Sequence, residues 1–180
     1  MPAPPTEGPW LDGPRAALLV LGAASSALIA GAWFFELVVG LQPCKLCLLQ
    51  RVPHYAVMAV SLAAFTPTSL RRARVVALGL ALGGIVTAAA LGGHHVGVEQ
   101  GWWLGPADCG GRVAASAASV GDFLKDLGKV KVVSCTQASW TFLGVSMAGW
   151  NAVCSLAALA AGIAALNRDY RNGSAAAVLR

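Results

Sequence analysis

Cys44 and Cys47, separated by two residues, are the pair of side chains best suited to chemistry in this chain. A Cys-x-x-Cys pair can close a disulfide and reopen it, because the short loop between the sulfurs costs little entropy to close. The pair stands where one long apolar run ends and the next begins, which places a redox-capable dithiol at a membrane surface. There it could pass electrons to a molecule dissolved in lipid. An unreactive pair that only packs is the weaker interpretation.

Cys109 and Cys135 form a second pair, 26 positions apart in the only long polar loop. A structural disulfide is the simplest interpretation for two loop cysteines in an oxidising compartment. Beside a reactive dithiol, however, such a disulfide becomes a partner for exchange. Cys109 is followed by Gly110 and Gly111, so we expect its surroundings to be open to an incoming thiolate.

The position of the dithiol at the start of a helix favours a thiolate, because the helix dipole stabilises negative charge there. The cations Lys45 and Arg51 act in the same direction. Cys47 lies one helical turn from Arg51, so we predict that Cys47 is the thiol with the lowered pKa. Arg51 is predicted to stabilise the charge of a reduced acceptor or of the thiolate, because charges just inside a membrane are costly and usually functional. The alternative is that Arg51 snorkels to the headgroups.

His94 and His95 close the third apolar run on the side of the cysteines. One of them could donate a hydrogen bond or a proton near the electron acceptor, and a structural role is equally compatible with the sequence. We predict no metal, because there is no second Cys-x-x-Cys and adjacent histidines point in different directions on a helix. Cys154, in the middle of the last apolar run, is expected to be a small apolar filler, and Glu36 a helix-end residue.

The composition indicates that these residues are carried by a membrane protein. Of 180 residues, 57% are hydrophobic and only 12% are charged, whereas roughly 25% are charged in soluble domains. The net charge is +5, but the basic residues fall in short clusters between apolar runs. That distribution is typical of membrane topology and argues against a nucleic-acid partner.

Four apolar runs are long enough to cross a bilayer, for which about 20 residues suffice; they cover approximately residues 16–39, 46–65, 75–93 and 142–166. We predict an all-α membrane protein, a four-transmembrane-helix bundle that forms a single domain over residues 1–180. A cleavable signal peptide is disfavoured for the first run, which is too long and follows acidic residues and prolines. Pro53 is expected in the first turn of the second helix, where its missing N–H does no harm.

The basic residues of the short loops predict the orientation. Arg71, Arg72 and Arg74 separate the second and third runs, and further arginines flank both ends of the chain. The positive-inside rule therefore places both termini in the cytoplasm and loops 40–46 and 97–141 outside. All four loop cysteines then face an oxidising space, such as the periplasm of a bacterium.

The second outer loop contains one amphipathic segment. Apolar residues recur at helical spacing between Val120 and Val130, and charged residues take the opposite face. We predict a short horizontal amphipathic helix on the surface of the bilayer. A helix packed on a soluble partner or on the bundle is the alternative.

Two segments carry a resemblance to a known family. Residues 42–51 read QPCKLCLLQR and resemble the family segment Pro-Cys-x-Leu-Cys-x-x-(Glu or Gln)-Arg. Residues 135–144 read CTQASWTFLG and resemble its Cys-…-Trp-x-Phe-Leu-Gly run. With four spans and two outer cysteine pairs, nearly the whole chain resembles the disulfide bond formation protein B family, the thiol:quinone oxidoreductases of the bacterial inner membrane.

The resemblance implies a path for electrons. A reduced periplasmic thiol oxidase of the thioredoxin fold would attack Cys109 of a Cys109–Cys135 disulfide, and Cys135 would then cross to Cys44. Cys47, freed as a thiolate, would face ubiquinone or menaquinone from the membrane pool. The oxidase would thereby be restored for disulfide formation in other proteins.

The resemblance also implies roles for two polar residues of the spans. Arg51 matches the family arginine that supports quinone binding, and His95, at the end of the third run, matches a histidine near the quinone. Two positions depart from the pattern. Gln50 replaces the glutamate of some members, which removes a charge beside Arg51, and Gly97 stands where an aromatic residue is often found.

Two other functions are compatible with the sequence. An enzyme like vitamin K epoxide reductase also has four spans and two cysteine pairs, but its Cys-x-x-Cys follows the loop pair, whereas here it comes first. A non-enzymatic membrane scaffold would carry the same cysteines as two structural disulfides. Slow reduction by a mild dithiol would identify such a scaffold.

Overall fold

Long helices dominate the part of the chain that the computed structural model describes, residues 13–67, 70–106 and 134–178. The helices are α1 (Gly13–Leu37), α2 (Lys45–Ser61), α3 (Arg71–Glu99) and α5 (Met147–Val178). A short 3-10 turn, η1 (Leu62–Phe65), follows α2, and the strands β1 (Thr141–Phe142) and β2 (Val145–Ser146) form a small antiparallel hairpin before α5. The amphipathic segment between Val120 and Val130 lies outside the described residues.

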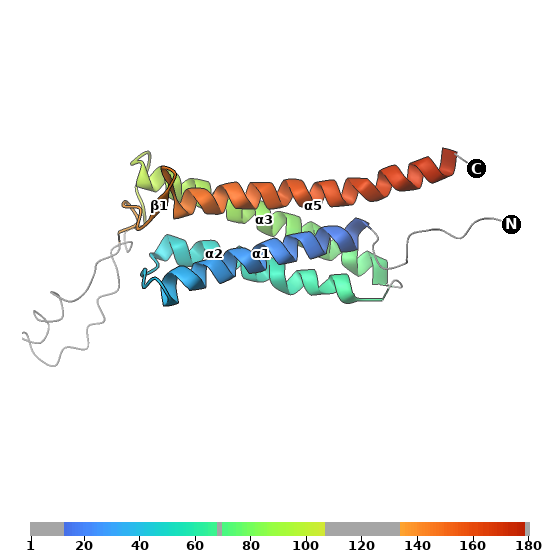
Figure 1. Cartoon of the computed structure of the whole chain (residues 1–180), viewed down its shortest axis with the longest axis horizontal. Helices are drawn as coiled ribbons and strands as arrows, with labels where there is room; N and C mark the ends of the chain where they lie inside the picture. Colours follow the sequence, from blue (N-terminus) through green and yellow to red (C-terminus); the bar gives the residue numbers. More distant parts are fainter. Residues whose placement is uncertain (1–12, 68–69, 107–133, 179–180) are drawn as a thin grey trace, which may run out of the picture.

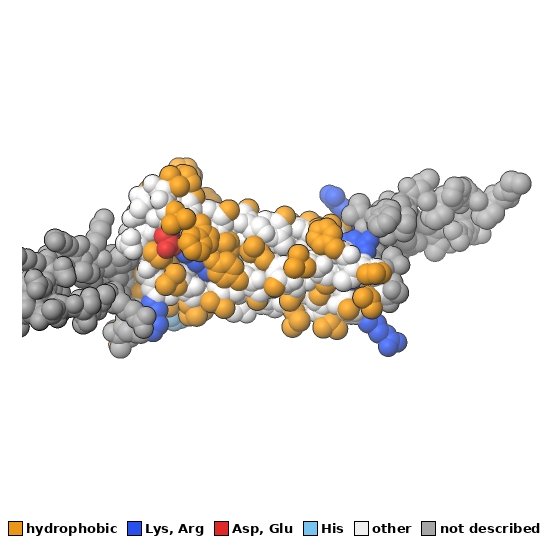
Figure 2. Space-filling view, turned by 90° about the horizontal axis from the view of Figure 1, so that it is seen from below, with side chains coloured by type: hydrophobic (Ala, Val, Ile, Leu, Met, Phe, Trp, Pro, Cys, Tyr) orange, Lys and Arg blue, Asp and Glu red, His pale blue; other side chains and the backbone are white. Residues whose placement is uncertain are grey.

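The described helices confirm the four-helix membrane architecture. Four segments are long and apolar enough to cross a bilayer: Gly13–Leu37, Lys45–Phe65, Arg71–Glu99 and Met147–Arg168. Figure 2 shows one face of the bundle, on which charged side chains gather toward the two ends and hydrophobic side chains occupy the middle. Large apolar side chains such as Val76, Leu80 and Leu156 point outward, as expected where lipid is the solvent.

The helices run up and down, so the two ends of the bundle have different contents. The start of α1, the far end of α5 and the connection between η1 and α3 lie together at one end (Figure 1). At that end Arg15 donates to the Thr66 carbonyl at 2.6 Å, and Arg74 donates to the Pro67 carbonyl at 2.8 Å. The start of α2, the hairpin and the end of α3 lie at the opposite end, so the cysteine-bearing loops share one side.

Small residues let the helices approach closely, as in many membrane bundles. A methyl group on Gly92 of α3 would lie 3.0 Å from the Ala148 carbonyl oxygen and from Ala152 Cβ of α5. The centre of the core is formed by fully buried apolar side chains, among them Leu18, Leu21, Val57, Ala81 and Ile85. Close helix packing therefore holds the bundle together, and buried polar side chains are exceptions in a mainly apolar core.

Two local expectations were wrong. Residues 142–146, placed in the fourth span, form the hairpin instead, because Leu143 and Gly144 adopt positive φ values of 52° and 78° and turn the chain. Trp150 then donates to the Phe142 carbonyl at 3.1 Å and fixes the hairpin to α5. Pro53 lies well inside α2 rather than in its first turn, because the helix already begins at Lys45.

Candidate redox site

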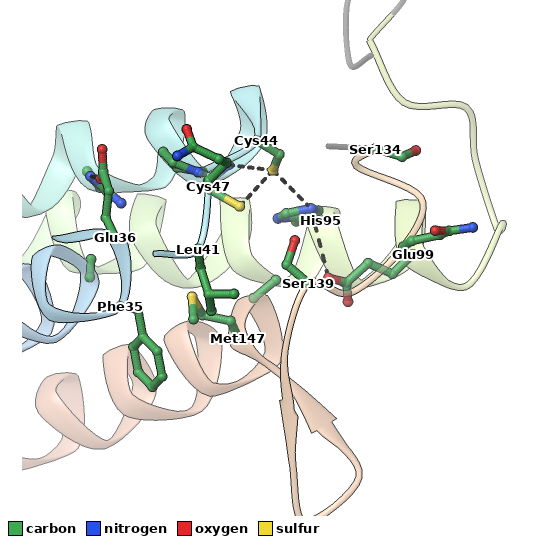
Figure 3. A pocket seen from close by; sticks show the side chains of 16 residues that line it. Phe35, Glu36, Leu41, Cys44, Cys47, His95, Glu99, Ser134, Ser139 and Met147 are labelled. Atoms are coloured by element: carbon green, nitrogen blue, oxygen red, sulfur yellow. Dashed lines mark hydrogen bonds and ion pairs between the residues drawn. The ribbon is translucent and has the colours of Figure 1, made fainter. Parts of the chain in front are cut away.

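Cys44 is the N-cap of α2, and this position defines the dithiol (Figure 3). Its backbone is extended, with φ −74° and ψ 170°, and its Sγ accepts a hydrogen bond from the Cys47 N–H at 3.1 Å. The two sulfurs are free thiols 2.6 Å apart. A disulfide requires about 2.05 Å between the sulfurs, so only a small movement separates the open pair from the closed one.

The contacts around Cys44 favour ionisation of Cys44 before Cys47, contrary to the expectation that Cys47 has the lowered pKa. The hydrogen bond from the Cys47 thiol, opposed by burial and assisted by His95 and the Cys47 N–H, lowers the pKa of Cys44 to about 5. The helix start adds a favourable dipole at the same sulfur. Proximity to Arg51 along the helix was therefore a weaker signal than the cap itself.

The alkylation of Cys44 is expected to depend on pH in an unusual range. Because the thiolate is the nucleophile and the pKa of Cys44 is lowered to about 5, the rate should rise through pH 5 and level off above about pH 6. An ordinary thiol would keep gaining reactivity up to about pH 9. The measurement is the rate of iodoacetamide labelling, resolved for each cysteine by peptide mass. The same labelling in denatured protein, in which Cys44 has lost its partners, serves as the comparison.

Cys135 reaches the dithiol from the loop before the hairpin. It is fully buried and disulfide-bonded, and it packs with Cys44, Leu46 and Val98. Its Sγ, the Cys44 Sγ and a ring nitrogen of His95 all lie within 4.8 Å of one another. Such spacing would also suit a metal ion, but a disulfide sulfur is not the thiolate that zinc binds. The arrangement suits disulfide exchange. Cys109 lies outside the described residues.

His95, rather than His94, belongs to the site. The ring of His95 is buried, with Nε2 3.7 Å from Cys44 Sγ and 3.9 Å from Glu99 Oε1, as Figure 3 shows. His94 points elsewhere and stacks on Trp103, with ring centroids 5.5 Å apart. Trp103 also fills the space where a side chain at Gly97 would begin. Trp103 thus occupies the space beside position 97, where the resemblance had led us to expect an aromatic residue.

Arg51 is paired with an acid that sequence analysis had left aside. Its Nη1 donates to Glu36 Oε2 at 2.5 Å, and its guanidinium lies 5.6 Å from the centroid of the Trp33 ring. Trp33 in turn donates to the Tyr55 hydroxyl at 3.0 Å. The signal for this pair was an acidic residue inside an otherwise apolar run. Glu36 is therefore part of the site and not merely a helix-end residue.

Two cavities adjoin the dithiol. The smaller, of about 40 Å³, is lined by Cys44, Cys47, Arg51 and His95 among others. The larger, of about 200 Å³, extends between α1, α2 and α5; its walls include Leu28, Phe35, Cys47, Arg51, His54 and Trp150. Mostly apolar walls with a few polar groups are typical of a site for a flat organic molecule. Cys47 and Arg51 are among the residues that line both cavities, and they are the sulfur and the cation nearest to such a molecule along that shared wall.

Comparisons with known proteins identify one family. The family model described as disulfide bond formation protein DsbB matches residues 14–165. The chain is 35% identical to a disulfide bond formation protein B of Methylococcus capsulatus, over 73% of this chain and 80% of the relative. It is 33% identical to that of Paracidovorax citrulli, over 81% and 83%, and 30% identical to that of a Polaromonas species, over 88% and 94%. No solved structure matches.

These matches disfavour both the reductase-like and the scaffold alternatives. The matched region contains the dithiol, Arg51 and Cys135. It covers α1 from its second residue, all of α2 and α3, and α5 as far as Ala165. The chain is a multi-pass membrane protein with a Cys-x-x-Cys pair at one end of its bundle, and it belongs to the family of disulfide bond formation protein DsbB.

Proposed function

We propose that this thiol:quinone oxidoreductase takes electrons from a periplasmic thioredoxin-fold thiol oxidase through Cys109 and Cys135, and passes them through Cys44 and Cys47 to a membrane quinone. The observation that carries the proposal is the position of one sulfur. Cys44 Sγ lies 2.6 Å from Cys47 Sγ and within 4.8 Å of the disulfide-bonded Cys135. One sulfur is therefore adjacent to both an inner thiol and an outer disulfide.

Disulfide exchange along this route keeps the number of disulfides constant. Attack of the soluble thiolate on Cys109 would break the Cys109–Cys135 bond and release Cys135 as a thiolate. Cys135 would then attack Cys44 of an oxidised Cys44–Cys47 pair, and Cys47 would leave as the thiolate. Each exchange forms one S–S bond and breaks one. The second thiolate of the soluble protein would then break its mixed disulfide with Cys109, so that the soluble protein leaves as a disulfide and Cys109 is a thiolate. Cys109 would attack Cys135 of the Cys135–Cys44 disulfide, which restores the Cys109–Cys135 bond and frees Cys44. The two electrons of the soluble dithiol are then held by the reduced Cys44–Cys47 pair, of which Cys47 lines both cavities.

The residues around the larger cavity fit a quinone. Leu28, Phe35 and Trp150 offer apolar surface to a ring and an isoprenoid tail, and Arg51 offers a donor to a ring oxygen. A bound quinone, ubiquinone or menaquinone, would accept two electrons and two protons and leave as the quinol. Strong thiol oxidases have potentials near about −120 mV, so their reoxidation requires a still stronger acceptor. A quinone dissolved in the bilayer would meet that requirement.

The orientation that this function needs is supported by the basic residues. Arg15, Arg71 and Arg74 occupy the end of the bundle that holds the start of α1 and the far end of α5 (Figure 1). In a bacterial inner membrane, the positive-inside rule would place that end and both termini in the cytoplasm. The dithiol, the hairpin and Cys135 would then face the periplasm.

The test is a visible absorption spectrum of the Cys44→Ser protein in detergent during titration with ubiquinone. This variant leaves Cys47 unpaired beside the larger cavity, so a long-wavelength band is expected to grow with quinone and to vanish when quinone is removed. Wild-type protein with a closed dithiol is the control and should show no such band. Absence of the band, together with absence of quinone-dependent thiol oxidation by the wild type, would overturn the proposal.

A further inference from the structure

A chain of buried polar side chains leads from the dithiol into the middle of the bundle. His95, next to Cys44, is hydrogen-bonded through Nδ1 to Gln50 Nε2 at 2.7 Å. Gln50 Oε1 accepts from Asn151 Nδ2 at 2.8 Å, and Asn151 Oδ1 lies 3.0 Å from His54 Nε2. His54 Nδ1 lies 3.3 Å from Ser25 Oγ. The chain joins all four long helices, and its two histidines and Gln50 are no more than 6% exposed.

The direction of every hydrogen bond in this chain follows from one backbone group. The Ala88 carbonyl can only accept, and Asn151 Nδ2 lies 3.4 Å from it, so the NH₂ group of Asn151 faces Ala88 and Gln50. Gln50 must then present its oxygen to Asn151 and its NH₂ group to His95. Turning either amide over would bring two acceptors or two donors together in an apolar interior, where an unpaired polar group is costly.

The histidine tautomers follow from these directions. Because the NH₂ group of Gln50 donates to His95 Nδ1, that nitrogen carries no proton, and the ring N–H is on Nε2, 3.7 Å from Cys44 Sγ. At the other end, Asn151 Oδ1 requires a donor, so His54 carries its proton on Nε2 and accepts from Ser25 at Nδ1. A thiolate at Cys44 also requires a hydrogen-bond donor. The contacts at both ends of this chain of polar side chains therefore require a proton on Nε2 of the nearby histidine.

We infer that Gln50, Asn151 and His54 are positioning residues that hold His95 as the Nε2–H tautomer and aim this N–H at the Cys44 sulfur. The inference rests on the proposed function, because it assigns these residues to Cys44, the sulfur that Cys135 attacks in the exchange. Asn151 is the decisive member, since it alone touches Gln50, His54 and the Ala88 carbonyl. Asn151 lies on α5, which bears no cysteine of either pair, and it acts on the dithiol through Gln50 and His95.

Other groups around Cys44 do not fix the ring in this way. Cys47 of α2 and the disulfide-bonded Cys135 are neighbours of the sulfur itself. Glu99 of α3 faces His95 Nε2 at 3.9 Å and competes for the same N–H, so it also favours a proton on that nitrogen. The backbone carbonyl of Cys135 is a further acceptor for a ring N–H of His95. The Gln50 amide contacts His95 Nδ1 at 2.7 Å, and it is the group to which we assign the unprotonated state of Nδ1.

The first experiment measures the tautomer in the unaltered protein. Histidine labelled with ¹⁵N in the full chain gives ring shifts that distinguish Nε2–H from Nδ1–H, and His95→Gln assigns the signal. We expect His95 to carry its proton on Nε2 between pH 6 and pH 8, values chosen to bracket the usual His pKa of about 6.5. A proton on Nδ1, or a doubly protonated ring throughout this range, would overturn the inference. Neither oxidase nor quinone is needed, so the result does not depend on whether the proposed function holds.

The second experiment asks whether Asn151 acts through His95. Asn151→Leu is expected to raise the pH midpoint of Cys44 labelling by about one unit, since the loss of an oriented donor to a charged group is of that order. In a His95→Ala background, the same substitution should produce no further shift. An equal shift in both backgrounds, or none in either, would overturn the inference.

Ser155→Ala is the matched control for this pair of variants. Ser155 is buried on the same helix, one turn from Asn151, and its Oγ has no hydrogen-bond partner among the described residues. We expect the pH midpoint of Cys44 labelling in Ser155→Ala to equal that of the wild type. Quinone-dependent turnover, measured on the same samples, distinguishes failure of the positioning chain from failure of the proposed function. Turnover in the wild type with no midpoint shift in Asn151→Leu would reject the positioning chain alone, whereas a midpoint shift without turnover would reject the proposed function alone.

Discussion

Replacing Cys47 by serine is expected to abolish electron transfer from a reduced dithiol protein to quinone, with turnover reduced by at least about 10³-fold. Cys47 is the cysteine that lines both cavities and lies 2.6 Å from Cys44, and a serine hydroxyl can neither form a disulfide nor carry the electrons. The measurement is the rate of quinol formation in detergent with a reduced thioredoxin-fold oxidase as donor. Retention of full turnover would exclude the route through Cys47.

Cys154→Ser provides the matched comparison for this result. Cys154 is also a free thiol and lines the larger cavity together with Cys47, but it lies on α5, away from Cys44. Any effect of this substitution is expected in the KM for quinone rather than in kcat, because the thiol of Cys154 contributes only surface. A loss of kcat equal to that of Cys47→Ser would mean that the cysteines act through a common structural effect and not as a dithiol.

The helices and the dithiol were predictable from sequence because they depend on local patterns. Long apolar runs define spans wherever lipid is the solvent, and two cysteines with a fixed spacing at the start of a helix must lie close together. The hairpin at Thr141–Ser146 was not predictable in the same way, because Thr141, Phe142 and Val145 fit an apolar helix equally well. Only the positive φ of Leu143 and Gly144 separates the two outcomes.

The partners of the polar residues were not predictable, because they depend on which helices become neighbours. His54 and Asn151 lie 97 positions apart in two different apolar runs, and neither run indicates the other as its partner. Their pairing requires α2 and α5 to present one face to each other. The available signal was physical: a polar side chain in a membrane helix is costly unless it is paired. Asn151, His54 and Glu36 all satisfy that criterion, and all three acquire partners in the fold.

The choice between Cys44 and Cys47 shows how a local rule can be applied to the wrong residue. Both cysteines stand near the start of α2, and the helix dipole acts on both. The structure places only Cys44 at the N-cap, where its sulfur accepts the Cys47 N–H at 3.1 Å. The prediction of Cys47 rested instead on its distance along the helix to Arg51. Because the cap position is a single residue wide, the sequence alone did not show that Cys44 would occupy it.

Arg51→Leu is expected to raise the KM for quinone by at least about tenfold and to lower the free energy of unfolding by about 3 kcal/mol. Two effects are combined in this variant. The cavity loses its cationic donor, and Glu36 loses the partner that lies 2.5 Å away, which leaves a carboxylate in an apolar environment. The side chains of Arg51 and Glu36 are 11% and 25% exposed, so neither charge can be fully hydrated. KM is measured by quinol formation, and stability by thermal unfolding in detergent.

The double variant Glu36→Leu with Arg51→Leu separates the two effects. Removing both charges leaves no unpaired ion, so stability is expected to return to within about 1 kcal/mol of the wild type. The KM for quinone should nevertheless remain raised, because the donor at the cavity is still absent. If the double variant recovers both stability and KM, the pair serves only to hold α1 against α2. If it recovers stability alone, Arg51 acts on the quinone, and Glu36 acts by keeping that guanidinium at the wall shared by the two cavities.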